Sequence, residues 1–371
     1  MPPPRPRWET NKKQPPPKAQ KAQKIQKTKP ADPEPQAAIP LELQQLLLNI
    51  FKDSFAERFA TDVKPRLQEV KGHLYNRDFA AAFGRTEYLE TYAARWSASR
   101  ALGYADLFWE LRSKLWPDDD HGHATEGERD GSLERKGQRV VCLGGGAGAE
   151  LVALAGVQRL SCTADDSDGA HSKGTMNAMA VDIADWTPVI SSLTKHLTTA
   201  PTLSKYASAA IKAANAPLVT FEDFCISFQQ LDVLTGDHDG LTTMVKDAGL
   251  VTLMFTLNEL YSTSLALTQK FLLNLTASLP KGAMLLVVDS PGSYSTITLN
   301  GAEKKYPMQW LLDHTLLNHA SSDVKVTQKS QEASWEKVHE DESRWFRLDA
   351  VLRYPIELEN MRMQLHLYRR I

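Results

Sequence analysis

An amide and a carboxylate, Asn258 and Glu259, follow the apolar run LVTLMF at residues 250–255. The run predicts a buried strand, so both polar side chains stand where that strand ends. A partly buried carboxylate there can accept a proton from a bound ligand, and an amide can hydrogen-bond a carbonyl and stabilise charge on it. The same residues could instead start a helix, because Asn favours the N-cap and Glu in the first turn complements the helix dipole.

A glycine-rich loop lies in the stretch RVVCLGGGAGAELVALAG, between a β-branched run and a helical run. Glycines let the backbone approach a ligand closely, and the helix N-terminus offers free N–H groups. The loop therefore predicts a site for an adenosine-like or phosphate group. Gly144, Gly146 and Ala149 also satisfy the GxGxxA fingerprint of NAD enzymes, so the glycines leave two cofactors open. The candidate cofactor-binding residues here are Gly144, Gly146, Gly148 and Glu150.

Acidic residues separate the two cofactors better than the glycines do. A dinucleotide fold needs an acid about 20 residues after its loop, where this chain reads DDSDGAHSKG with no strand before it. Asp182, at the end of MNAMAVD, fits a carboxylate that binds a ribose diol from the tip of the second strand. Asp232 follows FCISFQQ and would lie near an adenine amino group. Each acid alone could equally be a helix cap or a solvated loop residue.

These candidate residues must be positioned by a parallel sheet, because short apolar runs alternate with helical ones after residue 138. The last run, LRYPIELENMRMQLHLYRR, contains two strand-like segments around a Glu-Asn turn and predicts an antiparallel hairpin at one sheet edge. An α/β sheet finished in this way is the Rossmann-like outline of class I methyltransferases. The predicted strands cover 139–144, 179–183, 225–229, 250–255 and 283–289.

The rest of the chain divides by composition. Residues 39–116 carry apolar residues at helical spacing and predict a helical N-terminal subdomain. Residues 117–137 are polar and glycine-dotted and predict an exposed connector to a methyltransferase domain at 138–371. Residues 1–38 hold nine Lys/Arg against three Asp/Glu and few apolar residues, so we expect a disordered basic tail. Such a tail could bind phosphate backbones or simply aid solubility.

Length and composition indicate a globular protein without a membrane partner. The chain has 371 residues, of which 42% are hydrophobic, but its apolar runs are far shorter than the roughly 20 residues of a membrane-spanning helix. The segment MPPPRPRWETNKK lacks the apolar core of a secretory signal, so we expect the nucleus, including the nucleolus, or the cytoplasm. The widely spaced Cys142, Cys162 and Cys225 form no CxxC pair, and we expect no metal site.

Several motifs together resemble a known family. The glycine loop, AVDIADW, TLNELY, DSPGSYS, YPMQWLLDHTLL and LENMRMQLHLY are similar to the fungal S-adenosylmethionine (SAM)-dependent methyltransferases that modify uridine N3 in large-subunit (25S) rRNA. The runs YNRDFAAAFG and YAARWSASRALGY are similar as well, and the resemblance covers about residues 40–371. One position departs from the general methyltransferase pattern, because Cys142 stands where an acid commonly holds the methionine amino group. Glu150, or a residue of the N-terminal subdomain, would have to substitute for it.

The resemblance implies SAM as cofactor and rRNA, within a pre-60S particle, as partner. Asn258 and Glu259 would then meet the acceptor base: Glu259 would take the N3 proton of uracil, and Asn258 would pair with a uracil carbonyl. The expected substrate-binding residues are Ser290 and Tyr294, on the loop after the fifth strand, with Arg95 and Arg100. Tyr294 could stack on the extruded base, or it could simply pack locally in a turn. The arginines could cover the cofactor or contact RNA phosphate, or they could be solvated on a helix face.

Two other functions stay open on the residues alone. An NAD(P)-dependent oxidoreductase is supported by the GxGxxA fingerprint. A non-catalytic RNA-binding or ribosome-assembly factor could keep the methyltransferase fold without its activity.

Overall fold

The computed structural model describes residues 37–117, 137–165, 174–292, 294–299, 302–317 and 334–371. Residues 37–371 form one compact unit. The predicted basic tail, apart from residues 37 and 38, and nearly all of the predicted connector lie outside the described residues. The helical character predicted for residues 39–116 is present throughout that region.

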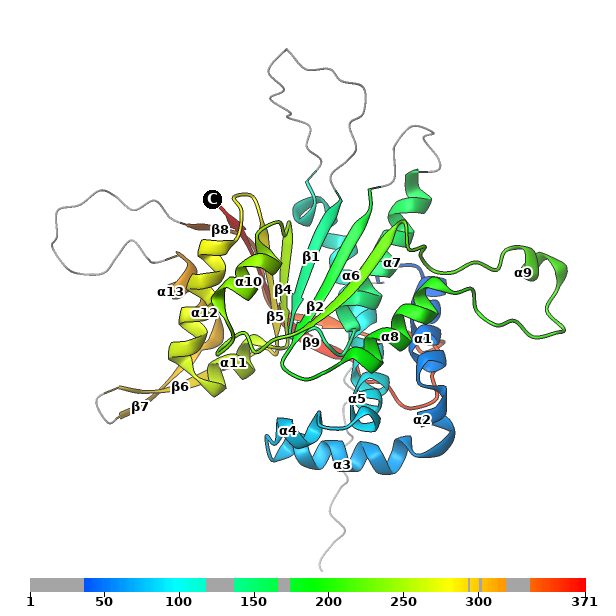
Figure 1. The fold of residues 1–371 in the computed structure, drawn as a ribbon, viewed down its shortest axis with the longest axis horizontal. Coiled ribbons are helices and arrows are strands. Elements are labelled where there is room, and N and C mark those ends of the chain that lie inside the picture. The colour runs from blue at the N-terminus through cyan, green and yellow to red at the C-terminus, as the bar shows by residue number, and fades with distance from the viewer. Residues whose placement is uncertain (1–36, 118–136, 166–173, 293, 300–301, 318–333) are drawn as a thin grey trace, which may run out of the picture. The chain divides into compact units, whose positions relative to one another are not determined.

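A seven-stranded mixed sheet forms the centre of the molecule (Figure 1). Its strand order is β3-β2-β1-β4-β5-β9-β8. The first five strands are parallel to one another, β9 is antiparallel to β5, and β8 is antiparallel to β9. This confirms the predicted class I methyltransferase sheet with an antiparallel pair at its edge. The strands are β1 (Gln138–Leu143), β2 (Met176–Asp182), β3 (Phe224–Gln230), β4 (Leu250–Met254), β5 (Met284–Asp289), β8 (Trp335–Phe346) and β9 (Met361–Arg370).

The predicted C-terminal hairpin is half wrong. Its second strand is β9, but the run LRYPIELE at 352–359 contains no strand, and β9 pairs instead with β8. The sequence of β8, WEKVHEDESRWF, hides its strand character because it is an edge strand with charged residues on its exposed side. Register shifts between Lys337 and His339 and between Asp341 and Arg344 also break the alternation that marks a strand.

The segment 347–360, between β8 and β9, packs on the N-terminal helices instead of joining the sheet. The Tyr354 hydroxyl donates to the Ala94 carbonyl at 2.7 Å, and its ring meets the Phe59 ring edge-on. Gln45 exchanges two hydrogen bonds with the backbone of Arg353, at 2.8 and 3.0 Å. This segment therefore ties residues near the two ends of the described chain to each other.

Helices cover both faces of the sheet (Figure 1). On one face, α1, α6, α7 and α8 pack with alternate strand residues such as Val140 and Cys142. On the other face, α10, α11, α12 and α13 pack with Val141 and Leu143. The bounds are α1 (Leu41–Ser54), α6 (Ala98–Leu115), α7 (Ala149–Asp165), α8 (Thr187–Thr198), α10 (His238–Val245), α11 (Leu257–Thr263), α12 (Leu265–Ser278) and α13 (Met308–Leu317).

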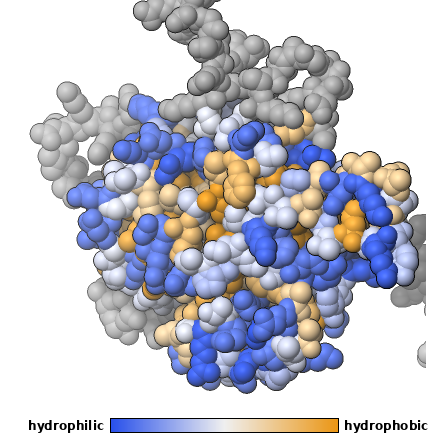
Figure 2. Space-filling view, turned by 45° about the vertical axis from the view of Figure 1, so that its right-hand side comes forward, coloured by the Kyte–Doolittle hydropathy of each residue, from blue (hydrophilic) through white to orange (hydrophobic). Residues whose placement is uncertain are grey.

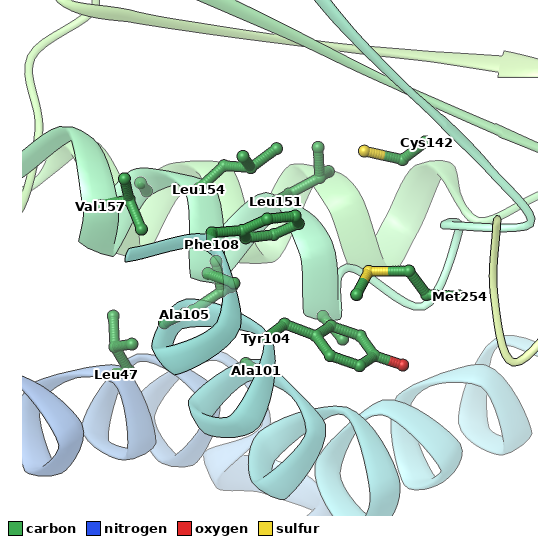
Figure 3. Packing of buried hydrophobic residues seen from close by; sticks show 14 of the residues in the cluster. Leu47, Ala101, Tyr104, Ala105, Phe108, Cys142, Leu151, Leu154, Val157 and Met254 are labelled. Carbon is green, nitrogen blue, oxygen red and sulfur yellow. The ribbon is translucent and has the colours of Figure 1, made fainter. Parts of the chain in front are cut away.

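Helix α6 brings the N-terminal region into the main core (Figure 3). Its residues Ala101, Tyr104 and Phe108 are buried in the same cluster as Leu151 of α7 and Met254 of β4. The remaining elements are α2 (Ala56–Thr61), α3 (Val63–Tyr75), α4 (Phe79–Ala82), α5 (Thr86–Tyr92), the π-helix η1 (Ala93–Ser97), α9 (Ala209–Ala213) and the hairpin of β6 (Tyr294–Leu299) and β7 (Ala302–Pro307).

The molecular face in Figure 2 is largely hydrophilic, with apolar residues in patches between polar ones. Among the helices of the described ranges, none combines the length and the apolar character needed to cross a lipid bilayer.

Candidate cofactor and active site

The candidate residues converge on the carboxyl edge of the parallel strands. In an open α/β sheet this edge is where ligands bind, because loops from neighbouring strands meet there. In Figure 1 it faces α11 on one side and the N-terminal helices α3 to α5 on the other. The edge carries the glycine loop after β1, Asp182 at the end of β2, Asp232 after β3, Asn258 and Glu259 after β4, and Asp289 at the end of β5.

The glycine loop is held closely between two neighbouring side chains. Gly144 has a φ of +79° and donates to the Val181 carbonyl at 2.7 Å. A β-carbon on Gly144 would lie 2.3 Å from Thr256 Oγ1, and one on Gly146 would lie 2.1 Å from the Trp186 ring. Gly148, also at φ +79°, leads into α7. The loop therefore has no room for side chains and presents its backbone at the start of a helix.

Asp182 ends β2 beside this loop. Its carboxylate accepts hydrogen bonds from the Gly146 N–H at 3.1 Å and the Ala184 N–H at 3.3 Å. Burial raises the pKa of this carboxyl, while the two N–H groups oppose the shift. Asp182 thus fixes the loop and stands at the strand tip where a ribose diol would be bound.

Asp232 lies two residues beyond β3, next to Asp182. The two strand ends are joined because the Leu231 N–H donates to the Asp182 carbonyl at 2.8 Å. The Asp232 carboxylate accepts from the Leu234 N–H at 2.9 Å and the Thr235 hydroxyl at 2.5 Å. The local turn therefore uses both of its oxygens, although Asp232 caps no helix.

Glu150 is a buried acid in the first turn of α7, with 3% of its surface exposed. Its Oε1 has no hydrogen-bond partner among the described residues. Burial raises the pKa of Glu150 to about 7, and the charge of Asp182 adds to that rise, whereas the backbone N–H of Glu150 and the charge of Arg100 oppose it. A buried carboxylate oxygen without a donor is costly, so this one is suited to a cationic ligand group.

Arg100 reaches the site from α6. Its Nη1 donates to the Tyr92 hydroxyl at 3.0 Å, and its guanidinium lies 4.9 Å from the centroid of the Phe255 ring. Phe255 follows β4 with a φ of +56°, a left-handed conformation that is uncommon for a bulky residue. Tyr104 stacks on the same ring at 6.4 Å. Arg100 is thereby held at the tip of β4 by three aromatic residues.

Asn258 and Glu259 lie in the first turn of α11, after the N-cap Thr256. Asn258 is therefore not the N-cap that the structural alternative proposed; its backbone N–H donates to Asp289 Oδ2 at 3.0 Å, and its Oδ1 is buried without a partner among the described residues. Glu259 pairs with Arg77, which lies between α3 and α4, at 2.5 Å. The helix-dipole contribution expected of Glu259 is consistent with its place in the first turn.

Asp289 is a site residue that the sequence analysis did not select. It ends β5 with 3% of its surface exposed and accepts from the Asn258 N–H and, at 2.8 Å, from the Ser290 N–H. Burial raises the pKa of Asp289 to about 6. The signal was present in AMLLVVD, because an acid there ends a buried run, as in MNAMAVD.

The candidate substrate-binding residues separate into two groups. Ser290 and Tyr294 follow β5; the Ser290 carbonyl accepts from Gln364 at 2.8 Å, and Tyr294 is 57% exposed at the start of the β6–β7 hairpin. Arg95 is 6% exposed in η1 and pairs with Glu359 of the segment 347–360. Arg95 therefore faces that segment, whereas Arg100 faces the tip of β4.

Comparison with known proteins decides the class of the site. The profile of a SAM-dependent methyltransferase family matches residues 51–369. This chain belongs to that family. Our chain, a SAM-dependent methyltransferase, is also 33% identical over 341 residues to the 25S rRNA (uridine(2843)-N(3))-methyltransferase of Saccharomyces cerevisiae. This match covers 87% of our chain and 85% of the yeast protein.

Solved methyltransferase structures are more distant. A SAM-dependent methyltransferase from Leishmania major has a TM-score of 0.35 and 10% identity, covering 76% of this chain and 81% of that one. One from Methanosarcina mazei has a TM-score of 0.34 and 9% identity, covering 64% and 94%. The strand order of the sheet and the family match establish the fold.

The family assignment removes the NAD(P)-dependent oxidoreductase, since the cofactor of this family is SAM. The site itself fits that cofactor. The glycine loop offers backbone without side chains, Asp182 stands at the tip of β2 for a ribose, and the unpartnered Oε1 of Glu150 can accept from an ammonium group. These features belong to three different segments that meet at one sheet edge.

Proposed function

We propose that this methyltransferase modifies N3 of a uridine in large-subunit (25S) rRNA. The observation that carries the proposal is the 33% identity to the yeast uridine-N3 enzyme, which extends over 87% of this chain and so includes both the sheet edge and the N-terminal helices. The cofactor residues would be Gly144, Gly146, Gly148 and Glu150, together with Asp182 and Asp232.

The acceptor base would meet the tip of β4. Uracil N3 carries a proton that must leave as the nitrogen becomes a nucleophile, and SAM, when bound, supplies an electrophilic methyl group. The amide of Asn258 would donate to a uracil carbonyl and stabilise the charge that develops there. Its Oδ1 is buried and without a partner among the described residues, so this oxygen is available to accept a hydrogen bond from a ligand N–H.

Glu259 would take the N3 proton. It forms an ion pair with Arg77, and both side chains are about half exposed, so an RNA phosphate could compete for the arginine. Release of Arg77 would leave the carboxylate free to accept a proton. Asp289 has another part in this proposal: both of its oxygens accept backbone N–H groups, and it positions α11 against β5.

Tyr294 would stack on the extruded base, and Ser290, which also follows β5, would contact the substrate nearby. An enzyme that acts on N3 must expose the Watson–Crick edge, and aromatic stacking offsets the lost base stacking. Arg95 is buried and paired, so it is better suited to holding the N-terminal helices than to contacting RNA.

Modification mapping tests the proposal. Large-subunit rRNA from cells that lack the protein should be missing a single N3-methyluridine, and the purified enzyme should restore it with SAM. Restoration on pre-60S particles but not on deproteinised rRNA would support a pre-60S substrate and action in the nucleolus. An unchanged set of N3-methyluridines would overturn the proposal, and SAM binding without any transfer would favour a non-catalytic assembly factor.

A further inference from the structure

The position that commonly holds the methionine amino group in class I methyltransferases is Cys142 here, and it cannot act as an acid. Cys142 is fully buried in β1, and burial raises the pKa of its thiol well above the usual range. A neutral thiol gives an ammonium group neither charge nor a strong acceptor. The amino-acid end of the cofactor must therefore be held by other residues.

Glu150 places its unpartnered oxygen beside Cys142. A β-carbon built on Gly145 would lie 2.7 Å from the Cys142 β-carbon and 3.3 Å from Glu150 Oε1, so all three meet at the glycine loop. The helix dipole explains why a glutamate is favoured in this first turn. It does not explain why one oxygen is buried without a donor among the described residues, since an N-terminal acid is equally stabilised when solvated.

A positive group, the Arg100 guanidinium, lies near the same loop. It contacts Tyr92, whose ring packs on Trp186, and the Trp186 ring lies against Gly146. No ion pair within 4.0 Å joins Arg100 to Glu150 in the described part of the chain, although the charge of each affects the pKa of the other. The guanidinium has five N–H donors in a planar fork that matches a carboxylate, and Tyr92 takes one of them. A buried acid and an arginine that do not pair directly are complementary to a zwitterion placed between them.

We infer that Glu150 and Arg100 bind the amino-acid end of the methyl donor. Glu150 accepts hydrogen bonds from the ammonium group, and Arg100 donates to the carboxylate. The inference depends on the SAM dependence of the family and not on which nucleotide is methylated. Of the two roles expected for Arg100, covering the cofactor or contacting RNA phosphate, it favours the first, and it makes α6 of the N-terminal region part of the cofactor site.

Affinities for two ligands show whether a substitution affects binding of the amino-acid end alone or disturbs the whole cofactor site. S-adenosylhomocysteine carries the amino-acid end, whereas 5′-methylthioadenosine has the same adenosine and thioether without it. In calorimetric titrations of the full chain, Glu150→Gln should lower the affinity for S-adenosylhomocysteine roughly ten- to hundredfold and leave that for 5′-methylthioadenosine unchanged. Arg100→Met should do the same, and Arg100→Lys should lose less because it keeps the charge but not the fork.

Asp182→Asn is the matched control, because a ribose contact is present in both ligands. It should weaken the two ligands by the same factor. The melting temperature of each variant shows whether it is folded. If Arg100→Met does not fold, Arg100→Lys is used in its place. The inference is overturned if the Glu150 and Arg100 variants keep their affinity for S-adenosylhomocysteine. It is also overturned if they lose affinity for S-adenosylhomocysteine and for 5′-methylthioadenosine by the same factor. An unchanged set of N3-methyluridines in cells that lack the protein, with this binding pattern intact, would contradict only the proposed substrate.

Discussion

Arg77 and Glu259 are 182 positions apart in the sequence, and their side chains form an ion pair at 2.5 Å. Arg77 adopts a left-handed backbone, with a φ of +56°, in the turn between α3 and α4. Glu259 lies in the first turn of α11, directly after the tip of β4. The pair therefore connects the N-terminal helices to the element that would meet the acceptor base.

Replacing Glu259 tests whether it removes the N3 proton. Glu259→Gln keeps the shape of the side chain but cannot take a proton, so methyl transfer to 25S rRNA should fall by about 10²–10⁴-fold. The rate is measured with radiolabelled SAM, and affinity for S-adenosylhomocysteine should be unchanged. Arg77→Met is the control for the ion pair itself and should leave most of the activity. A Glu259→Gln enzyme that turns over normally would rule out this role.

A methyl group on Gly146 should disturb the cofactor loop. In Gly146→Ala the new β-carbon would lie 2.1 Å from the Trp186 ring, so the loop or the tryptophan must move, at a cost of about 1–3 kcal/mol in the free energy of unfolding. Affinity for S-adenosylhomocysteine should fall as well. Gly240→Ala is the matched control, because in the described structure no atom outside its own helix backbone and chain neighbours lies within 4 Å of its β-carbon position. Equal behaviour of the two variants in denaturation and titration would contradict the close packing of the loop.

Arg95 should matter for stability and not for RNA affinity. Arg95→Met removes the ion pair between the buried Arg95 and the exposed Glu359 and should lower the free energy of unfolding by about 1–3 kcal/mol, measured by denaturant titration. The KM for rRNA should stay the same. Arg66 forms an exposed ion pair with Glu69, so Arg66→Gln should change stability by less than about 1 kcal/mol. A raised KM with unchanged stability in Arg95→Met would instead restore Arg95 as an RNA contact.

Tyr294 should contribute to RNA binding through its ring. Stacking of a base on an aromatic side chain contributes about 1–3 kcal/mol, so Tyr294→Ala should weaken RNA binding by roughly five- to hundredfold, while Tyr294→Phe should keep the affinity. Filter binding with an rRNA fragment measures both. Tyr206 is 83% exposed between α8 and α9, and Tyr206→Ala serves as the surface control. If the two alanine variants bind alike, Tyr294 is not a stacking residue.

Stability should depend on pH through the buried His366. Burial, together with the Lys337 charge, lowers the pKa of His366 to about 4 from an unfolded value of 6.5, against the opposing charges of Asp313 and Glu340. The unfolded chain therefore binds the proton more tightly between these values, and the free energy of unfolding rises with pH from about 4 to 6.5. The full contribution, at most about 3 kcal/mol, is present above pH 6.5 and is lost as pH falls to 4.

Denaturation at several pH values measures this effect against His366→Gln, which keeps a polar side chain but does not titrate. The difference in unfolding free energy between the two proteins should change by that amount over the window. A constant difference from pH 4 to 7 would show that His366 does not cause the dependence.

The parallel strands and the acids at their tips could be predicted from the sequence, because a buried strand between two helices is a near-continuous apolar run. The run before Asp182 and the run before Asn258 both carry this signal. Strand β8 does not, since an edge strand needs only one apolar face and its register shifts interrupt the alternation. The competing run at 352–359 is apolar because it packs on helices, and periodicity alone does not distinguish these two environments.

The roles of individual arginines needed the structure. Arg95 and Arg100 are five residues apart, which places them on different sides of a helix with 3.6 residues per turn, and the π-helix at Ala93–Ser97 changes the spacing further. The partners of Arg77 and Arg95 are 182 and 264 positions away in sequence. Such pairings depend on how loops pack after the sheet has formed, and no local pattern encodes them.

The segment 347–360 also has a consequence for synthesis on the ribosome. Gln45 finds its partner Arg353 only after 308 further residues have been added, and Arg95 and Tyr354 make their contacts with similarly distant positions. A nascent chain therefore carries α1 and η1 for most of its translation without these contacts. Because η1 leads directly into α6, the enzyme should become competent to retain its methyl donor only when elongation is nearly finished.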